Sequence, residues 1–207
     1  MTSPTIASRT DAAIKPLAIY WTIGLIIGTT YLNAGFRQLP SEFSTSHWIS
    51  IWIGLAITVV TTLAYAKVST RDGRSLHLPT LIAFPLLNGL FETALFLASF
   101  KLGMSAVAIW TTNPVWLFLA GIFTFCAYSG AIHALFWLRV LPPHLNKDKA
   151  LNNFRRVWMV GLVAVSVLWG WIYFAYQDVW SVVALHALFD AGMVYCIHYQ
   201  LSAKPIS

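Results

Sequence analysis

Four ionisable residues lie inside long apolar stretches of the chain, where such residues are rare. Glu92 and Asp190 are the two acidic residues, out of seven in all, that are found there rather than in loops or tails. His133 and His186 have similar positions. An ionisable side chain at the centre of a membrane helix costs about 2.5 to 3.5 kcal/mol on insertion scales, so each of the four is a candidate functional residue.

Three of these stretches carry two polar residues four positions apart, a spacing that places both on one face of a helix. The pairs are Asn88 with Glu92, Ser129 with His133, and His186 with Asp190. Lipid cannot solvate polar groups. We therefore expect the three polar faces to meet one another or a water-filled cavity.

The chemistry that such residues support is the activation of water. Glu92 is a candidate general base, and an imidazole can stabilise an oxyanion or ligate a metal. Asp190, one turn from His186, can fix the tautomer of that imidazole. Two histidines with one or two carboxylates also suit zinc with an open coordination position. The sequence thus predicts catalytic roles for Glu92, His133, His186 and Asp190, with His133 and His186 as candidate ligands of a divalent metal such as zinc.

The composition places these residues in an integral membrane protein. Apolar residues make up 58% of the 207 positions and charged residues only 10%, whereas soluble domains carry about 25% charged residues. The net charge of +6 is explained by orientation in the membrane and attraction to anionic lipid. We expect membrane lipid, and not nucleic acid, as the partner of the basic residues.

Six stretches are long and apolar enough to cross a bilayer, which takes about 20 residues. They are Pro16–Leu32, Trp48–Ala66, Leu78–Phe100, Pro114–Leu138, Val157–Tyr176 and Val179–Leu201. The sequence predicts an all-α fold: a polytopic membrane helix bundle with six transmembrane helices, forming one integral, multi-pass domain over residues 1–207. The segment Leu102–Thr112 is too short to span and is expected to lie in the interface or to re-enter the membrane.

The distribution of basic residues predicts the orientation of this bundle. With six spans, eleven of the 13 lysines and arginines fall on the side of the two termini, and Arg37 and Lys101 fall on the other. The positive-inside rule then places both termini in the cytoplasm. Local signals agree with the span limits. Asn113-Pro114 and Asp178 are expected to begin helices, and Pro142-Pro143 to end one.

The order of the polar residues resembles that of the CAAX prenyl protease and bacteriocin-processing family of intramembrane endopeptidases. The segment Ala184–Asp190 is similar to the family's His-x-x-x-Asn/Asp motif, and Ser129–Phe136 to its second motif, which ends in His. Phe91–Thr93 corresponds to the first, glutamate-containing motif. The resemblance covers the stretch from Leu78 to Leu201.

The resemblance implies that Glu92 activates the water and that His133 and His186 stabilise the oxyanion or bind metal. It also implies that Asp190 supports His186 and that the substrate is a membrane-embedded or lipidated peptide. The first motif is degenerate, because Thr93 replaces a second glutamate and Phe96 replaces an arginine.

Two other functions are compatible with the sequence. One is a catalytically silent relative that acts as an accessory or assembly subunit of other membrane proteins. The other is a haem- or pigment-binding protein that uses His133 and His198 as axial ligands. At 1.5 Å per residue, His133 lies about 8 Å to the cytoplasmic side of its helix middle, and Glu92 about 4 Å to the outer side. Helix tilt or a kink at Pro85 is therefore needed for the two to meet.

Overall fold

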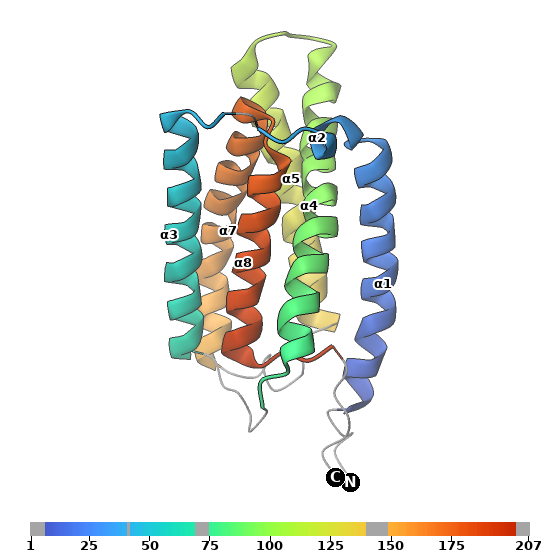
Figure 1. Ribbon diagram of the computed structural model, residues 1–207, viewed down its shortest axis with the longest axis vertical. Helices are drawn as coiled ribbons and strands as arrows, with labels where there is room; N and C mark the ends of the chain where they lie inside the picture. The colour runs from blue at the N-terminus through green and yellow to red at the C-terminus, as the bar shows by residue number, and fades with distance from the viewer. Residues whose placement is uncertain (1–6, 41, 69–74, 140–148, 202–207) are drawn as a thin grey trace.

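The computed structural model describes residues 7–40, 42–68, 75–139 and 149–201, all of them in helices or short connections. The helices are α1 (Ala7–Thr30), α2 (Asn33–Arg37), α3 (Thr45–Val68), α4 (Leu78–Ala108), α5 (Pro114–Arg139), α7 (Lys149–Tyr176) and α8 (Val179–Ile197). The six long helices run side by side, and the short α2 crosses one end of the bundle (Figure 1). The described part of the chain is thus all-helical, as expected.

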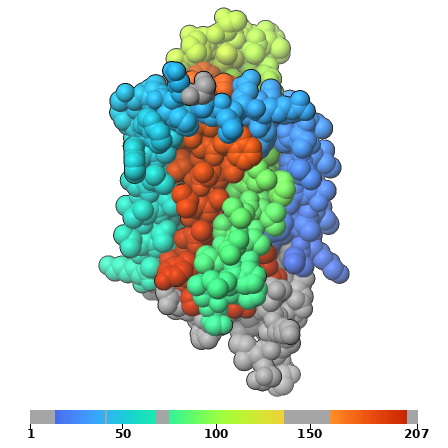
Figure 2. Space-filling view, viewed as in Figure 1, coloured from blue at the N-terminus to red at the C-terminus, as the bar shows by residue number. Residues whose placement is uncertain are grey.

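Helices α4 and α8 form the centre of the bundle. Helix α4 packs against α1, α5 and α8, and α8 packs in addition against α3 and α7. On the face shown in Figure 2, α8 lies between α3 and α4, and α1 flanks the other side of α4. Side chains that point inward from α4 and α8 therefore meet each other.

In the part of the chain that the structure describes, four helices are long and apolar enough to cross a membrane. They comprise Thr45–Lys67, Leu78–Ala108, Pro114–Leu135 and Val179–Ile197. The described apolar parts of α1 and α7, Ile14–Thr30 and Gly161–Tyr176, are shorter. Large apolar side chains, such as Val59, Val60 and Leu63 of α3, are exposed on the outside of the bundle, as lipid-facing side chains would be. The chain is accordingly a helical protein of the membrane.

Helix α4 is longer than the sequence indicated. The expectation that Leu102–Thr112 forms a separate interfacial or re-entrant segment is wrong, because the helix continues from Phe100 to Ala108. No proline interrupts it there, and Gly103 packs so closely on α5 that a Cβ at this position would lie 2.5 Å from the Ala120 carbonyl oxygen. The α4–α5 hairpin extends beyond the other helices at this end (Figure 1).

Other helix limits differ because a helix can extend beyond its apolar part. Helix α1 begins at Ala7, ahead of the expected Pro16, and α7 begins at Lys149, ahead of Val157. Helix α8 ends at Ile197, where His198 adopts a left-handed conformation with φ 49°. Two expected helix starts are confirmed: Asn113 Oδ1 accepts from Val115 N at 2.9 Å, and Asp178 Oδ1 from Ser181 N at 3.0 Å. Pro142-Pro143 lies outside the described residues.

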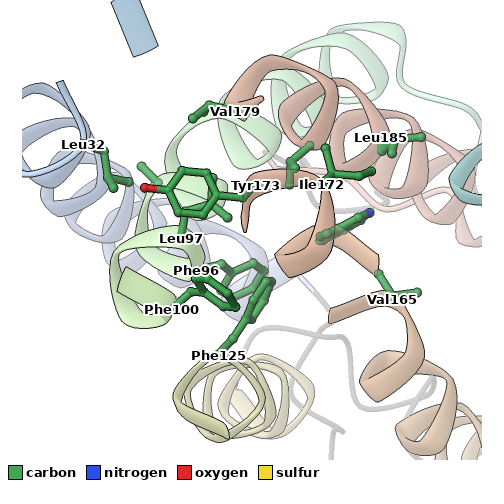
Figure 3. Close-up of a cluster of buried hydrophobic side chains, with 13 residues drawn as sticks. Leu32, Phe96, Leu97, Phe100, Phe125, Val165, Ile172, Tyr173, Val179 and Leu185 are labelled. Carbon is green, nitrogen blue, oxygen red and sulfur yellow. The ribbon is translucent and has the colours of Figure 1, made fainter. Parts of the chain in front are cut away.

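Two apolar clusters hold the helices together and leave a polar layer between them. The larger cluster, shown in Figure 3, stacks aromatic rings such as Phe96, Phe100 and Phe125 between α4, α5 and α7. The second cluster, with Phe84 of α4, lies nearer the ends where α1 and α4 begin. Between Phe84 and Phe96, α4 carries the buried polar residues Asn88, Glu92 and Thr93.

Candidate active site

The close approach of α4 and α8 depends on a glycine. A Cβ at Gly89 would lie 2.7 Å from the Cβ and 2.9 Å from the Cα of Ala187, closer than atoms can pack. Small residues at such crossings let helix backbones approach each other. The neighbouring polar residues of the two helices are thereby brought within contact distance.

Glu92, His186 and Asp190 meet at this crossing. His186 Nε2 lies 3.4 Å from Glu92 Oε2 and 3.5 Å from Asp190 Oδ2. All three side chains are buried, with His186 only 3% exposed. The expectation that the polar faces of these two helices meet is met by the structure: one imidazole faces two carboxylates.

Asn88 joins the two carboxylates. Its Nδ2 donates to Asp190 Oδ2 at 2.8 Å and also to Glu92 Oε2. Trp21 Nε1 of α1 donates to Asn88 Oδ1 at 3.0 Å. Because the indole can only donate, it fixes the orientation of the Asn88 amide, with its NH₂ group toward the carboxylates.

The imidazole of His186 is held on its other side by residues of α4 and α7. Thr93 Oγ1 and His186 Nδ1 are hydrogen-bonded at 2.9 Å. The Phe96 ring stacks on the imidazole at a centroid distance of 5.5 Å, and Trp169 lies at 4.9 Å. With Nδ1 occupied, Nε2 is the nitrogen that faces the carboxylates.

Helix α1 contributes a tyrosine to the same cluster. Tyr20 OH donates to Glu92 Oε1 at 2.8 Å and accepts from Tyr128 OH of α5 at 3.2 Å. Gly24, one turn further along α1, permits this contact, because a Cβ there would lie 2.3 Å from the Phe91 carbonyl oxygen.

A cavity of about 180 Å³ adjoins the cluster. Its polar wall consists of Tyr20, Asn88, Glu92, His133 and Asp190. Its remaining lining is apolar and comes from α1, α3, α4, α5, α7 and α8, including Pro16, Leu17, Tyr65, Phe84, Ile132, Leu135, Leu162, Phe189 and Met193. This volume is large enough for several water molecules, and the polar wall offers hydrogen-bond partners for them.

His133 lines this cavity but lies outside the three-residue cluster. Its Nδ1 donates to the Ser129 carbonyl oxygen at 2.8 Å, and its ring stacks on Phe96 at 6.1 Å. The separation in depth expected from the sequence does not keep His133 away from Glu92, because both side chains line the same cavity.

The sequence did not indicate Tyr20, Trp21, Thr93 or Phe96 as site residues. Aromatic residues in a membrane span commonly face lipid or the interface, so neither Tyr20 nor Trp21 stands out. The sequence feature that could have indicated the contribution of α1 is Gly24-x-x-x-Gly28, although this pattern is frequent by chance in membrane helices. It does mark the α1–α4 contact here, since a Cβ at Gly28 would lie 3.3 Å from the Ala94 Cβ.

A second buried polar pair lies at the opposite end of the bundle. His47, in the first turn of α3, places its Nε2 3.0 Å from Asp178 Oδ2. Its ring stacks on Tyr176 at a centroid distance of 4.1 Å. Because Asp178 is also the cap of α8, the pair ties α3 to the α7–α8 connection.

Replacing His47 by Phe should keep the ring stacking and leave the Asp178 carboxylate buried without its partner. Breaking a buried ionic pair in this way costs about 3–5 kcal/mol, and we expect a clear fall in the thermal unfolding midpoint of the protein in detergent. The variant Asp178→Asn, which keeps the cap acceptor, completes a double-mutant cycle with His47→Phe. Fully additive effects would show that the two side chains do not interact.

The proposed haem pair involves His133 and His198. His133 faces the cavity beside Glu92, and His198 forms the C-terminal cap of α8. This alternative stays a prediction.

Comparison with known proteins finds no matching family model, no matching curated protein and no matching solved structure.

Proposed function

We propose that the protein is an intramembrane hydrolase, similar to the CAAX prenyl protease and bacteriocin-processing family, that cleaves an amide bond at the cavity beside Glu92. The observation that carries this proposal is the meeting of Glu92, His186 and Asp190 beside a cavity among apolar helices, with Glu92 and Asp190 on the cavity wall and His186 in contact with both behind it. A general base, an orienting carboxylate and an imidazole in mutual contact beside a cavity are the parts that hydrolysis requires.

In the proposed mechanism, the Glu92 carboxylate takes a proton from a cavity water as the water oxygen attacks the carbonyl carbon of the substrate. The carbonyl oxygen becomes an oxyanion, and the Tyr20 hydroxyl and the His186 imidazole stabilise the negative charge. When the C–N bond breaks, the proton held by Glu92 passes to the leaving amine. Asp190, beside Nε2, stabilises a positively charged His186 during this step.

The two residues that depart from the family pattern, Thr93 and Phe96, both contact the His186 imidazole. Thr93, in place of a second glutamate, holds His186 Nδ1, and Phe96, in place of an arginine, stacks on the same ring. Both contacts fix the imidazole by other means. These contacts favour a working site over a vestigial one, because a site without function would not need to restrain the ring from both sides.

The proposed topology has six spans and both termini in the cytoplasm. The six long helices lie side by side (Figure 1). In the described residues, four of them, α3, α4, α5 and α8, are long and apolar enough by themselves to cross a membrane. By their positions in the helices, seven basic residues belong to the turns nearest the end where α1 begins and α8 ends: Arg9, Lys15, Lys67, Arg139, Lys149, Arg155 and Arg156. Arg37 and Lys101 lie at the other end. This asymmetry supports a cytoplasmic location of the first end.

The test of the proposed activity is a cleavage screen with the full chain reconstituted in lipid nanodiscs. Two substrate sets are compared, peptides that carry a single lipid chain and peptides that span the bilayer, and products are identified by mass spectrometry. We expect cleavage of at least one set by the wild type and none by Glu92→Gln. Absence of cleavage in both sets would favour the accessory-subunit alternative.

Replacing Tyr20 by Phe is expected to lower kcat about 100-fold and to change KM little, because an oxyanion donor acts mainly in the transition state. Tyr128→Phe is the matched control, since Tyr128 reaches the cluster through Tyr20, and we expect a loss of less than about 10-fold. Steady-state kinetics on a cleaved peptide measures both. Equal effects of the two variants would contradict the role given to Tyr20.

A further inference from the structure

The distances between the imidazole of His186 and the two carboxylates are long for hydrogen bonds. His186 Nε2 lies 3.4 Å from Glu92 Oε2 and 3.5 Å from Asp190 Oδ2, beyond the usual range of about 2.7–3.2 Å for N–H···O. Nitrogen and oxygen ligands at about 2.0–2.2 Å from a tetrahedral zinc ion lie about 3.3–3.6 Å apart. The observed separations fit a shared cation better than they fit direct hydrogen bonds.

The charge of the cluster also favours a bound cation. Two carboxylates lie in an apolar interior, and the described residues that line the cavity include neither lysine nor arginine. A neutral imidazole with two carboxylates leaves a charge of −2 in the membrane, and a divalent cation neutralises it. All three ligand atoms lie within 4.8 Å of one another.

The surrounding contacts are those of a supported metal site. Thr93 occupies His186 Nδ1 and so directs Nε2 toward the carboxylates, the usual arrangement for a metal-bound histidine. Asn88 contacts both carboxylate oxygens but leaves each a second lone pair. Glu92 Oε1 stays paired with Tyr20, so only Oε2 is needed as a ligand.

We propose that Glu92 Oε2, His186 Nε2 and Asp190 Oδ2 bind one divalent transition-metal cation of the zinc class, with a free coordination position toward the cavity. Binding is argued from the ligand geometry alone. What the cation does there rests on the proposed function: with the cation bound, His186 stays neutral, and the cation would supply the positive charge that the mechanism above assigns to a protonated His186. This ligand set replaces the pair His133 and His186, because His133 is not among the three residues whose ligand atoms converge.

The experiment measures zinc binding by the full chain in detergent, without any activity assay. The protein is stripped with a chelator, titrated with ZnCl₂ against a chromogenic competitor, and analysed for metal by mass spectrometry after desalting. We expect about one zinc per chain and, with CoCl₂ as a second probe, the visible absorption bands of four-coordinate Co²⁺. Wild-type protein that retains neither metal would overturn the proposal, whatever the variants do.

Variants assign the ligands. Asp190→Asn and His186→Ala should each weaken zinc binding by more than about 100-fold, and Thr93→Val, which removes a supporting contact, by about 10-fold. His133→Ala is the matched control, a histidine on the same cavity, and should bind zinc as the wild type does. Equal losses in His133→Ala and His186→Ala would contradict the ligand set. Asp190→Asn keeps the side-chain size, so it remains informative if His186→Ala fails to fold.

The outcome separates the cation from the hydrolase. A zinc-free protein that still hydrolyses peptides in a Glu92-dependent manner would reject the cation and leave the proposed function intact. A zinc-loaded protein that cleaves no substrate would support the cation and count against the proposed function.

Discussion

Replacing Glu92 by Gln is expected to lower the rate of peptide hydrolysis by at least about 10³-fold, which is within the range for the loss of a general base. Gln has nearly the shape of Glu but cannot take a proton from water. Single-turnover kinetics in nanodiscs, with substrate bound before the reaction starts, measures the chemical step separately from substrate entry.

Two controls make this result specific to Glu92. Asp190→Asn should lower the rate less, by about 10²-fold, since Asp190 acts on His186 and does not itself activate the water. Ser129→Ala changes a buried polar residue on α5 that contacts His133, and should leave the rate within about threefold of the wild type. Undiminished hydrolysis by Glu92→Gln would remove Glu92 from the mechanism.

Replacing Gly89 by Val is expected to destabilise the protein by at least about 3 kcal/mol, at the upper end of overpacking effects. The first added atom already lies 2.7 Å from the Cβ of Ala187, and the two further methyl groups have no room between the helices. Because α4 and α8 must separate, Glu92 should also lose its contacts with His186 and Asp190. Activity and the unfolding midpoint in detergent should therefore fall together.

Gly130 provides the matched control for this substitution. It is also a helical glycine, on α5, but a Cβ there meets nothing within 4 Å. Gly130→Val should thus leave the unfolding midpoint close to that of the wild type. If Gly89→Val were as stable as Gly130→Val, the close crossing of α4 and α8 would be refuted.

The part of the site on α4 and α8 was visible in the sequence because it depends on local spacing. Asn88 and Glu92, like His186 and Asp190, lie four residues apart in apolar surroundings. Because lipid does not solvate the polar face of a membrane helix, that face packs against another polar face. Their contact across the two helices follows from this constraint, even though 94 residues separate Glu92 from His186 in the chain.

The contribution of α1 could not be predicted in the same way. Tyrosine and tryptophan are also common at lipid-facing positions, so the sequence does not distinguish Tyr20 and Trp21 from such residues. Their hydrogen bonds to Glu92 and Asn88 form only when α1 packs on α4. The His47–Asp178 contact was missed for a similar reason. Both residues lie near the ends of apolar stretches, where an interfacial position explains a polar side chain equally well.

The extent of α4 shows a limit of reading helices from hydropathy. The length of an apolar stretch indicates how many residues can lie in lipid. The length of the helix depends instead on the position of the next residue that terminates a helix. For α4 that point lies beyond Ala108, near Asn113-Pro114. The added turns extend the α4–α5 hairpin beyond the other helices, and Glu92 and His133 line the same cavity within the bundle.

The most direct test of the central claim is hydrolysis in water enriched in ¹⁸O. If a cavity water activated by Glu92 attacks the substrate carbonyl, the new carboxyl group of the wild-type product carries one ¹⁸O atom after a single turnover, and the Glu92→Gln protein yields no labelled product. Product without ¹⁸O, or labelled product formed equally fast by Glu92→Gln, would contradict the assignment of Glu92, His186 and Asp190 as a hydrolytic site.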